Sequence, residues 1–264
     1  MIEESTVNIL LEQKVDEVPW TIQQTFLGIF LTLVPWITLS IVLTNFRGPT
    51  LPTTPLPAKV DIINAVITFI VSVIVEGAFL IAPFYFANHA LRFVAHRGSQ
   101  VLRALGFRGF RPASTLSWIV LLFLAFLVIN VLYQDVINIL HLHLQTNDQL
   151  ILQESKRAPL TTYATLLAAV FIAPICEEIF FRGFVFAGFL RSMPLVWAII
   201  LSALLFAVAH ADPGSFAVLF FIGLALAFLR WRTQSLWPGI LLHLLNNGVS
   251  ALLIVLTMVG IVRS

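Results

Sequence analysis

Long apolar segments separated by short polar ones dominate this chain. In its first part the apolar segments lie at about residues 21–44, 62–91 and 114–133. A helix needs about 20 apolar residues to cross a hydrocarbon core of ~30 Å, and each of these segments is long enough. The pattern therefore predicts three membrane-spanning helices in this part of the chain.

Two polar segments connect the predicted spans. A proline-rich linker occupies residues 49–57, and five arginines lie in the basic loop at residues 92–111. We expect this proline-rich linker to have no core of its own. We therefore expect residues 1–158 to form one N-terminal membrane region that contains both connectors.

The apolar segments of the second part are more interrupted. They lie at about residues 159–190, 195–210, 216–229 and 234–262. The first is too long for one untilted crossing, and Pro174 predicts a bend in it. The last has Asn246-Asn247-Gly248 at its centre, so it could form one helix or two. The predicted fold class is all-α, a polytopic transmembrane helical bundle with seven or eight membrane helices.

Composition supports a membrane protein and excludes a set of soluble domains. The chain has 264 residues, of which 59% are hydrophobic and 11% charged, against roughly 25% charged in average soluble proteins. The formal net charge of +2 is too small to indicate nucleic-acid binding. We therefore expect the lipid bilayer to be a partner of this protein. The apolar segments predict a multi-pass membrane protein. Residues 1–20 are polar and acidic and show no signal-peptide pattern. The absence of a secretory or retention signal and the small size favour a prokaryotic plasma membrane.

Arginine positions predict the orientation. By the positive-inside rule the basic loop, Arg182 with Arg191, and Arg230 with Arg232 should be cytoplasmic. Alternation of the spans puts all three sets on one side, together with the N-terminus. If the spans are simple, His210 lies near the far end of its helix, whereas Glu177 and His243 lie nearer the cytoplasmic end. Only tilted, broken or short helices can bring these three residues to the same depth.

Three constellations of polar residues interrupt the apolar segments of the second part. In the first, Glu178 and Arg182 are four residues apart and can pair on one helix face, whereas Glu177 lies about 100° around the helix without a local partner. Ionisable groups inside a membrane are expensive and are functional candidates by default. The structural alternative is a buried ion-pair network that only fixes helix packing.

The other two constellations each place an imidazole on one helix face with a second group. Phe206 lies four residues before His210, and His243 lies four residues before Asn247. Buried polar groups cost free energy unless they are paired. We therefore expect Glu177 and these polar side chains to surround one cavity, although a single membrane histidine is more often a packing residue.

Two further residues invite a functional reading. Glu76 lies in the middle of the second span. It either carries a proton or binds substrate, or it makes a hydrogen bond that only helps the helices to pack. Cys176 is the only cysteine, which excludes an intrachain disulfide, and we read it as a small apolar filler and not as a nucleophile.

A cavity of this kind has the groups needed for amide hydrolysis. A buried carboxylate can take a proton from water, and imidazoles and an amide can stabilise an oxyanion. Histidine and carboxylate are also zinc ligands. Neither the HExxH motif nor a Gly-x-Ser-x-Gly elbow is present. The cofactor is therefore open: a divalent metal such as zinc, held by Glu177, His210 and His243, or none.

The three constellations resemble the three motifs of the CPBP family, the CAAX proteases and bacteriocin-processing enzymes, also called the ABI family. The match consists of Glu177-Glu178-x-x-x-Arg182, Phe206-x-x-x-His210 and His243-x-x-x-Asn247, in that order. It covers residues 159–260, and the segment 105–108 resembles a short basic segment that often precedes the family core. We expect residues 159–260 to form a catalytic core like that of the family.

The resemblance implies a role for each motif residue. Glu177 would activate water, and Glu178 would pair with Arg182 to hold the helix. His210 would assist the base or polarise the carbonyl, with Phe206 packed beside it. His243 and Asn247 would complete the site as an oxyanion hole. The family has been described both as metalloproteases and as metal-independent glutamate proteases.

These observations favour an intramembrane endopeptidase acting on a membrane-bound or lipidated peptide, of which a prenylated CAAX peptide is the family's best-known case. Two alternative functions belong to other classes of protein. A membrane immunity or scaffold protein would act by contact and would tolerate loss of the polar residues. An ion-coupled transporter would use them as a relay, and it would be expected to carry internal repeats, of which the sequence has none of clear length.

Overall fold

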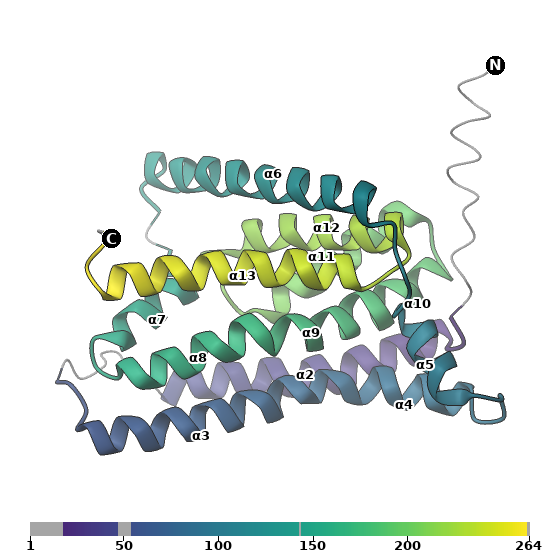
Figure 1. Cartoon of the computed structure of the whole chain (residues 1–264), viewed down its shortest axis with the longest axis horizontal. Helices are drawn as coiled ribbons and strands as arrows, with labels where there is room; N and C mark the ends of the chain where they lie inside the picture. The colour runs from purple at the N-terminus through teal and green to yellow at the C-terminus, as the bar shows by residue number, and fades with distance from the viewer. Residues whose placement is uncertain (1–17, 47–53, 143, 263–264) are drawn as a thin grey trace.

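A computed structural model describes residues 18–46, 54–142 and 144–262, so residues 49–53 of the proline-rich linker lie outside the described part. The described residues form helices joined by short connections and contain no strand (Figure 1). The all-α polytopic bundle is confirmed. The first half contains α2 (Ile22–Phe46), α3 (Ala58–Gly77), a 3₁₀ turn η1 (Ala78–Leu80), α4 (Ile81–Ala90), α5 (Arg97–Leu105), α6 (Pro112–Ile139) and α7 (Asn147–Ser155).

The second half carries the candidate site. It contains α8 (Pro159–Phe171), α9 (Ala173–Glu177), a π-helical segment η2 (Glu178–Val185), α10 (Phe186–Leu190), α11 (Leu195–Ala209), α12 (Phe216–Thr233) and α13 (Trp237–Met258). Within the described residues, six helical segments are long and apolar enough to cross a membrane, and α11 is a shorter apolar helix. Together they give seven, because α13 passes through Asn246-Asn247-Gly248 without a break.

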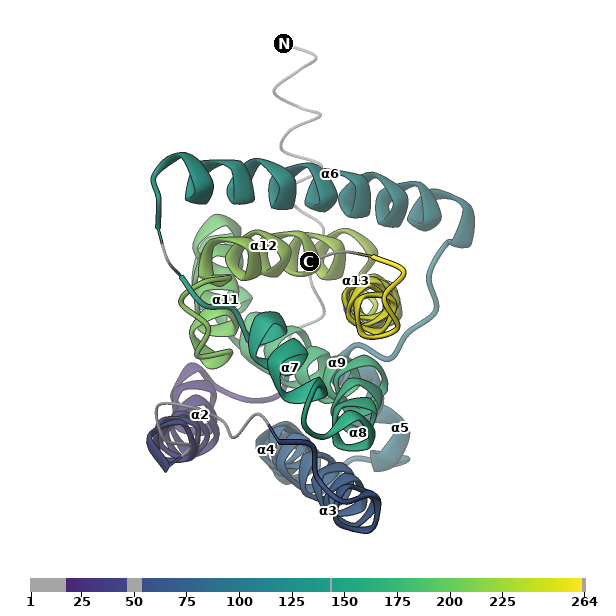
Figure 2. The ribbon, with the colours of Figure 1, turned by 90° about the vertical axis from the view of Figure 1, so that its left-hand side faces the viewer.

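The long segment from α8 to α10 is the centre of the bundle. In its most apolar part 61% of the residues are buried, whereas the corresponding share is 11% in the α3–α4 span and in the α6 span. Those two spans are therefore exposed over most of their surface, as expected for helices that face lipid. Seen end-on in Figure 2, α8 and α9 lie between the α3–α4 pair and the α12–α13 pair. Polar groups on this segment are therefore enclosed by protein.

This central segment is interrupted, as Pro174 predicts. The interruption lies at Ile172, between α8 and α9, and Pro174 occupies the first turn of α9, where its missing N–H costs no hydrogen bond. Immediately after α9 the helix widens into η2. Such π-helical turns are rare and are found mostly at functional sites.

Basic residues gather at the end of the bundle where α5 lies. The Leu236 N–H donates to the Gly106 carbonyl over 2.9 Å, and the Ser235 hydroxyl donates to the Arg108 carbonyl over 2.7 Å. These bonds join the α5 loop to the turn between α12 and α13. At the same end Arg191 donates to the carbonyls of Val18 and Trp20.

Arg182 is an exception to the predicted orientation set. Its side chain is completely buried inside the bundle, so it is not one of the loop arginines on which the orientation argument depends. The positive-inside rule counts arginines in loops, whereas this guanidinium is neutralised locally by a carboxylate one helical turn away.

Two structural features remove the difference in depth between the polar residues. Helix α11 has 15 residues, so it rises only about 22 Å and ends inside the bundle. Helix α13 begins against the α5 loop, where Leu236 is fully buried and donates to the Gly106 carbonyl. His210 and His243 consequently approach the level of Glu177.

Asp61 joins the first half of the bundle to the start of the central segment. Its carboxylate is buried and accepts hydrogen bonds from the Leu160 N–H (2.9 Å), the Thr161 N–H (3.0 Å) and the Thr161 hydroxyl (2.7 Å). The first N–H groups of a helix have no partner within the helix, so Asp61 caps α8 from α3.

Replacement of Asp61 by alanine is expected to destabilise the protein by about 1–3 kcal/mol, because buried donors would lose their acceptor. The measurement is unfolding of the purified protein in mixed micelles with increasing dodecyl sulfate. Asp135→Ala, at an exposed position on α6, is the control. Equal stability of the two variants would contradict the capping role.

Candidate active site

A buried ion pair lies at the base of the site. Arg182 Nη1 donates to Glu178 Oε1 over 2.7 Å, as their spacing predicts, and both side chains are fully buried. Arg182 Nη2 also donates to the Gly223 carbonyl over 3.2 Å, and the guanidinium lies 4.3 Å from the Phe206 ring centroid. The pair thus joins η2 to both α11 and α12.

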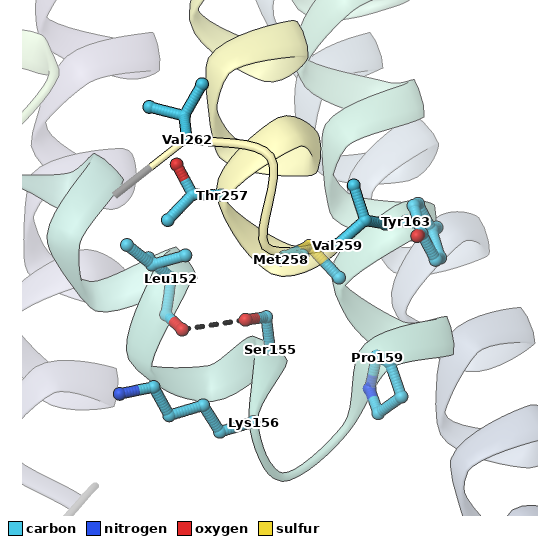
Figure 3. Close-up of a pocket in the computed structure, with 9 residues that line it drawn as sticks. All are labelled: Leu152, Ser155, Lys156, Pro159, Tyr163, Thr257, Met258, Val259 and Val262. Carbon is cyan, nitrogen blue, oxygen red and sulfur yellow. Dashed lines mark hydrogen bonds between the residues drawn. The ribbon is translucent and has the colours of Figure 1, made fainter. Parts of the chain in front are cut away.

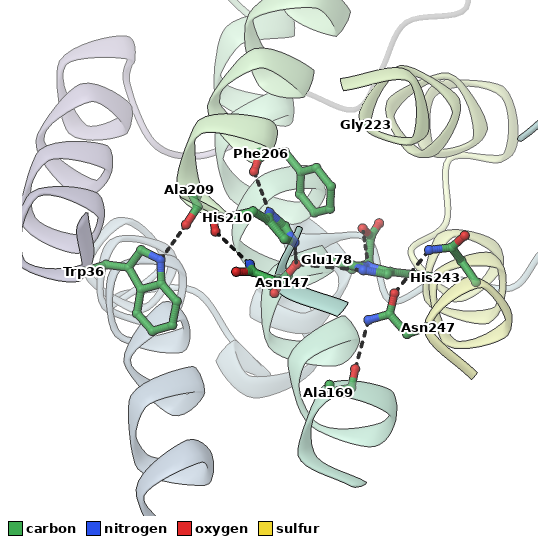
Figure 4. Close-up of polar contacts among 12 residues, drawn as sticks. Trp36, Asn147, Ala169, Glu178, Phe206, Ala209, His210, Gly223, His243 and Asn247 are labelled. Carbon is green, nitrogen blue, oxygen red and sulfur yellow. Dashed lines mark hydrogen bonds and ion pairs between the residues drawn. The ribbon is translucent and has the colours of Figure 1, made fainter. Parts of the chain in front are cut away.

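Glu177, the last residue of α9, lies between two imidazoles. Its Oε2 atom is 3.8 Å from His210 Nε2 and 3.9 Å from His243 Nε2 (Figure 4). Only 9% of the residue is exposed, and Oε2 has no hydrogen-bond partner in the described part of the chain. The carboxylate is therefore close to both rings and directly bonded to neither.

His210 is held by its own helix. Its Nδ1 atom lies 2.8 Å from the Phe206 carbonyl oxygen, so Nδ1 carries the hydrogen and donates it. In the neutral ring this leaves Nε2 as an acceptor that faces Glu177. The Phe206 ring packs against the imidazole at 4.5 Å between centroids.

His243 lies deeper than His210. Its Nδ1 atom is 3.4 Å from Glu178 Oε1 and its Nε2 atom faces Glu177, so each ring nitrogen is next to a carboxylate. The residue is 2% exposed and packs edge-on against Phe206 at 5.6 Å between ring centroids. His243 therefore links the ion pair to Glu177.

Asn247 lies one helical turn beyond His243, and part of its amide is already used. Its Nδ2 atom donates to the Ala169 carbonyl over 2.9 Å, and its Oδ1 atom accepts from Asn246 Nδ2 over 3.3 Å. One amide N–H remains for another partner. These bonds fix the side chain between α8 and α13.

The turn after His210 is fixed by residues that sequence reasoning did not select. Trp36 of α2 donates from its indole to the Ala209 carbonyl over 2.7 Å. Asn147, at the start of α7, donates from its side chain to the His210 carbonyl over 3.4 Å and from its backbone to Asp212 Oδ2 over 2.9 Å. The sequence signal was weak, since Asp212-Pro213-Gly214 reads as an ordinary turn.

A cavity of about 520 Å³ opens onto these groups. Among the residues that line it are Glu177, His210 and Asn247, together with Glu76 from α3. His243 and Glu178 are not among its lining residues, but His243 Nε2 lies 3.9 Å from Glu177 Oε2.

A second cavity, of about 590 Å³, lies where α7, α8 and the end of α13 meet (Figure 3). Its lining includes no histidine or carboxylate.

The possible metal ligands do not form a ready site. Among the described residues, no group of three or more His, Cys, Asp and Glu side chains is arranged so that it could hold a metal ion. His210 can still offer Nε2, but Glu177 is nearly 4 Å from each imidazole.

Gly239 of α13 packs directly on the ion pair. A Cβ atom at this position would lie 2.7 Å from Glu178 Oε2, too close for the buried carboxylate to avoid. Gly239→Ala is therefore expected to destabilise the protein by about 1–3 kcal/mol, as overpacking does. Thermal unfolding in detergent measures this loss.

The matched control for Gly239→Ala lies on the same helix. A Cβ atom at Gly248 would meet nothing within 4 Å. Gly248→Ala is expected to be neutral or stabilising by up to about 1 kcal/mol, since alanine is the better helix former. A destabilisation equal to that of Gly239→Ala would show that packing on Glu178 is not the cause.

Comparisons with known proteins match the second half of the chain. The family model described as Type II CAAX prenyl endopeptidase Rce1-like matches residues 159–249. A protein of Bacillus subtilis named "Putative membrane peptidase YdiL" is 31% identical over 101 residues, 38% of this chain. An uncharacterized protein of Mycoplasma capricolum subsp. capricolum is 32% identical over 144 residues, 50% of this chain.

The chain spans only part of these relatives, 40% of the first and 41% of the second. No solved structure matches the chain. The helices and the buried polar site define a multi-pass integral membrane protein, and bacterial relatives agree with the expected prokaryotic membrane. The match to the family model lies in residues 159–249, the part of the chain that carries the three motifs.

Proposed function

We propose that this protein is an intramembrane endopeptidase in which Glu177 activates water. The observation that carries the proposal is the position of Glu177, a buried carboxylate with an unpartnered oxygen, between two imidazoles and on the wall of a cavity. The family match over residues 159–249 and the printed name of the Bacillus relative support a peptidase.

In the first step water attacks the carbonyl carbon of the scissile amide. A gap of 3.8 Å between Glu177 Oε2 and His210 Nε2 is longer than a hydrogen bond, but one water can bridge such a gap. The water then gives one hydrogen bond to each group. Glu177 takes the proton as the C–O bond forms, and His210, with its acceptor Nε2, assists as the second acceptor.

The second step requires stabilisation of the oxyanion and protonation of the leaving amine. The remaining N–H of Asn247 and the ring of His243 are the donors proposed for the oxyanion. The C–N bond then breaks as Glu177 returns its proton to the departing nitrogen. The direct products are a new carboxylic acid, which keeps the second proton of the water, and a new amine. The acid then loses that proton, and the amine gains one, on contact with solvent, so Glu177 ends in its starting state.

The remaining motif residues hold this constellation in place. Glu178 and Arg182 fix η2, and Phe206 supports both imidazoles through ring contacts. In this proposal residues 159–260 carry the chemistry. The described residues of the N-terminal region complete the bundle around that core, and they contribute Trp36 behind His210 and Glu76 in the cavity wall.

The proposed substrate is a peptide already in the membrane, either an embedded segment or a lipidated chain such as a prenylated CAAX peptide. The test is hydrolysis of a fluorogenic farnesylated CAAX peptide by the purified protein, with its unprenylated counterpart as control. Each reaction is run with and without a chelator, which decides whether a metal takes part. Cleavage that needs the farnesyl group supports the prenyl substrate, and no cleavage of either peptide excludes it.

A further inference from the structure

The charges on the wall of the active-site cavity all have one sign. Four carboxylates line it: Glu76, Asp148, Glu177 and Asp212. No lysine or arginine is among the lining residues in the part of the chain that the structure describes. A cavity with charges of one sign and low-dielectric walls concentrates ions of the opposite sign.

Two of these carboxylates are occupied by structural bonds. Asp212 accepts from the backbone N–H groups of Asn147 (2.9 Å) and Ser215 (3.0 Å). Asp148 accepts from the Ser250 hydroxyl. Burial raises the pKa of Asp148, and the charge of Asp212 acts in the same direction, whereas the bond from Ser250 opposes it. The two neighbouring carboxylates therefore disfavour a further anion at this end of the cavity.

The other two carboxylates each offer an unoccupied oxygen. Glu76 Oε2 and Glu177 Oε2 are shielded from solvent and have no hydrogen-bond partner among the described residues. Both carboxylates line the same cavity. The buried guanidinium of Arg182 is already bonded to Glu178 and to the Gly223 carbonyl.

Buried acceptors without a partner cost free energy, and so does placing like charges together. Glu177 is committed to catalysis in the proposal above, but Glu76 belongs to α3, outside the matched family segment, and has no role in the steps derived there. Its carboxylate faces the cavity in which the peptide would lie. The missing partner of Glu76 is best supplied by the substrate.

We propose that the cavity selects a basic substrate, in which a lysine or arginine side chain near the scissile bond pairs with Glu76. This inference rests on the proposed peptidase function and specifies its substrate class. The same acidic wall disfavours a substrate carboxylate inside the cavity. A basic internal segment is thus a better occupant than a free C-terminal carboxylate.

The test uses the reconstituted full chain and three membrane-anchored peptides that differ only in one block of residues, which is lysine, glutamine or glutamate. Binding is read by fluorescence anisotropy and cleavage by mass spectrometry, so that one is measured independently of the other. Wild type is expected to bind the lysine peptide about tenfold or more tightly than the glutamine peptide, the size of a charge-assisted hydrogen bond. The glutamate peptide should bind weakest.

Three variants assign that preference to Glu76. Glu76→Gln should bring the lysine and glutamine peptides to nearly equal affinity, whereas Glu76→Asp, which keeps the charge, should retain most of the preference. Asp135→Asn removes one negative charge from an exposed position on α6 outside the cavity and should change neither. A folded Glu76→Gln protein that keeps the full preference would overturn the assignment to Glu76.

Failure of this inference differs from failure of the proposed function. Equal binding of all three peptides to wild type overturns the basic substrate class, whether or not any of them is cleaved. Selective binding of the lysine peptide without cleavage supports the acidic binding cavity and counts against the peptidase. Selective binding with cleavage supports both.

Discussion

Glu177→Gln is expected to lower peptide hydrolysis by about 10²–10⁴-fold, the usual contribution of a general base. The amide has nearly the same shape as the carboxylate but cannot accept the proton of the attacking water. Because Glu177 Oε2 has no hydrogen-bond partner among the described residues, its loss should leave the fold and the melting temperature nearly unchanged. The measurement is the initial rate of cleavage by equal amounts of folded wild type and variant.

A matched control for this variant is Glu154→Gln. Glu154 lies on α7, outside the lining of the cavity, and pairs with Arg157 at a partly exposed position. Its replacement should leave the rate of cleavage within about twofold, since exposed ion pairs contribute little. Full activity in Glu177→Gln would remove Glu177 from the mechanism.

The largest loss of stability is expected for Arg182→Met, about 3–5 kcal/mol, because it leaves the Glu178 carboxylate buried without its cation. Both side chains are fully buried and 2.7 Å apart, so solvent cannot replace the lost partner. Unfolding in mixed micelles measures the effect. Arg232→Met, at an exposed position on the last turn of α12, is the control and should change stability little.

A double variant separates the ion pair from simple packing. Glu178→Met together with Arg182→Met replaces both charges by apolar side chains, which is often neutral compared with breaking one partner. The double variant should therefore be more stable than Arg182→Met alone. A double variant that loses the sum of both single effects would show that the two residues act independently.

Local helical spacing explains what the sequence could predict. Residues four apart share a helix face, so the Glu178–Arg182 pair and the contact of Phe206 with His210 follow from their positions in the chain. The length of the apolar segments likewise predicts the bundle. These inferences depend on the covalent order of neighbouring residues and need no knowledge of how the helices pack.

Interactions between distant segments could not be predicted in this way. The indole of Trp36 holds the Ala209 carbonyl across 173 positions of sequence, and no local pattern marks that tryptophan. The π-helical turn also has no spacing signature, yet it places Arg182 inside the bundle and not at its surface. Glu76 shows the same limit, because only packing of α3 against α9 brings it to the cavity.

The central claim, that Glu177 uses water to cut a peptide bond within the membrane, is tested most directly by isotope incorporation. The reconstituted protein is incubated in H₂¹⁸O with a mixture of bacterial membrane peptides, and new termini are read by mass spectrometry. We expect wild type to produce new C-termini that carry ¹⁸O and Glu177→Gln to produce almost none. An absence of new termini with folded wild type, or equal amounts with both proteins, would contradict the account.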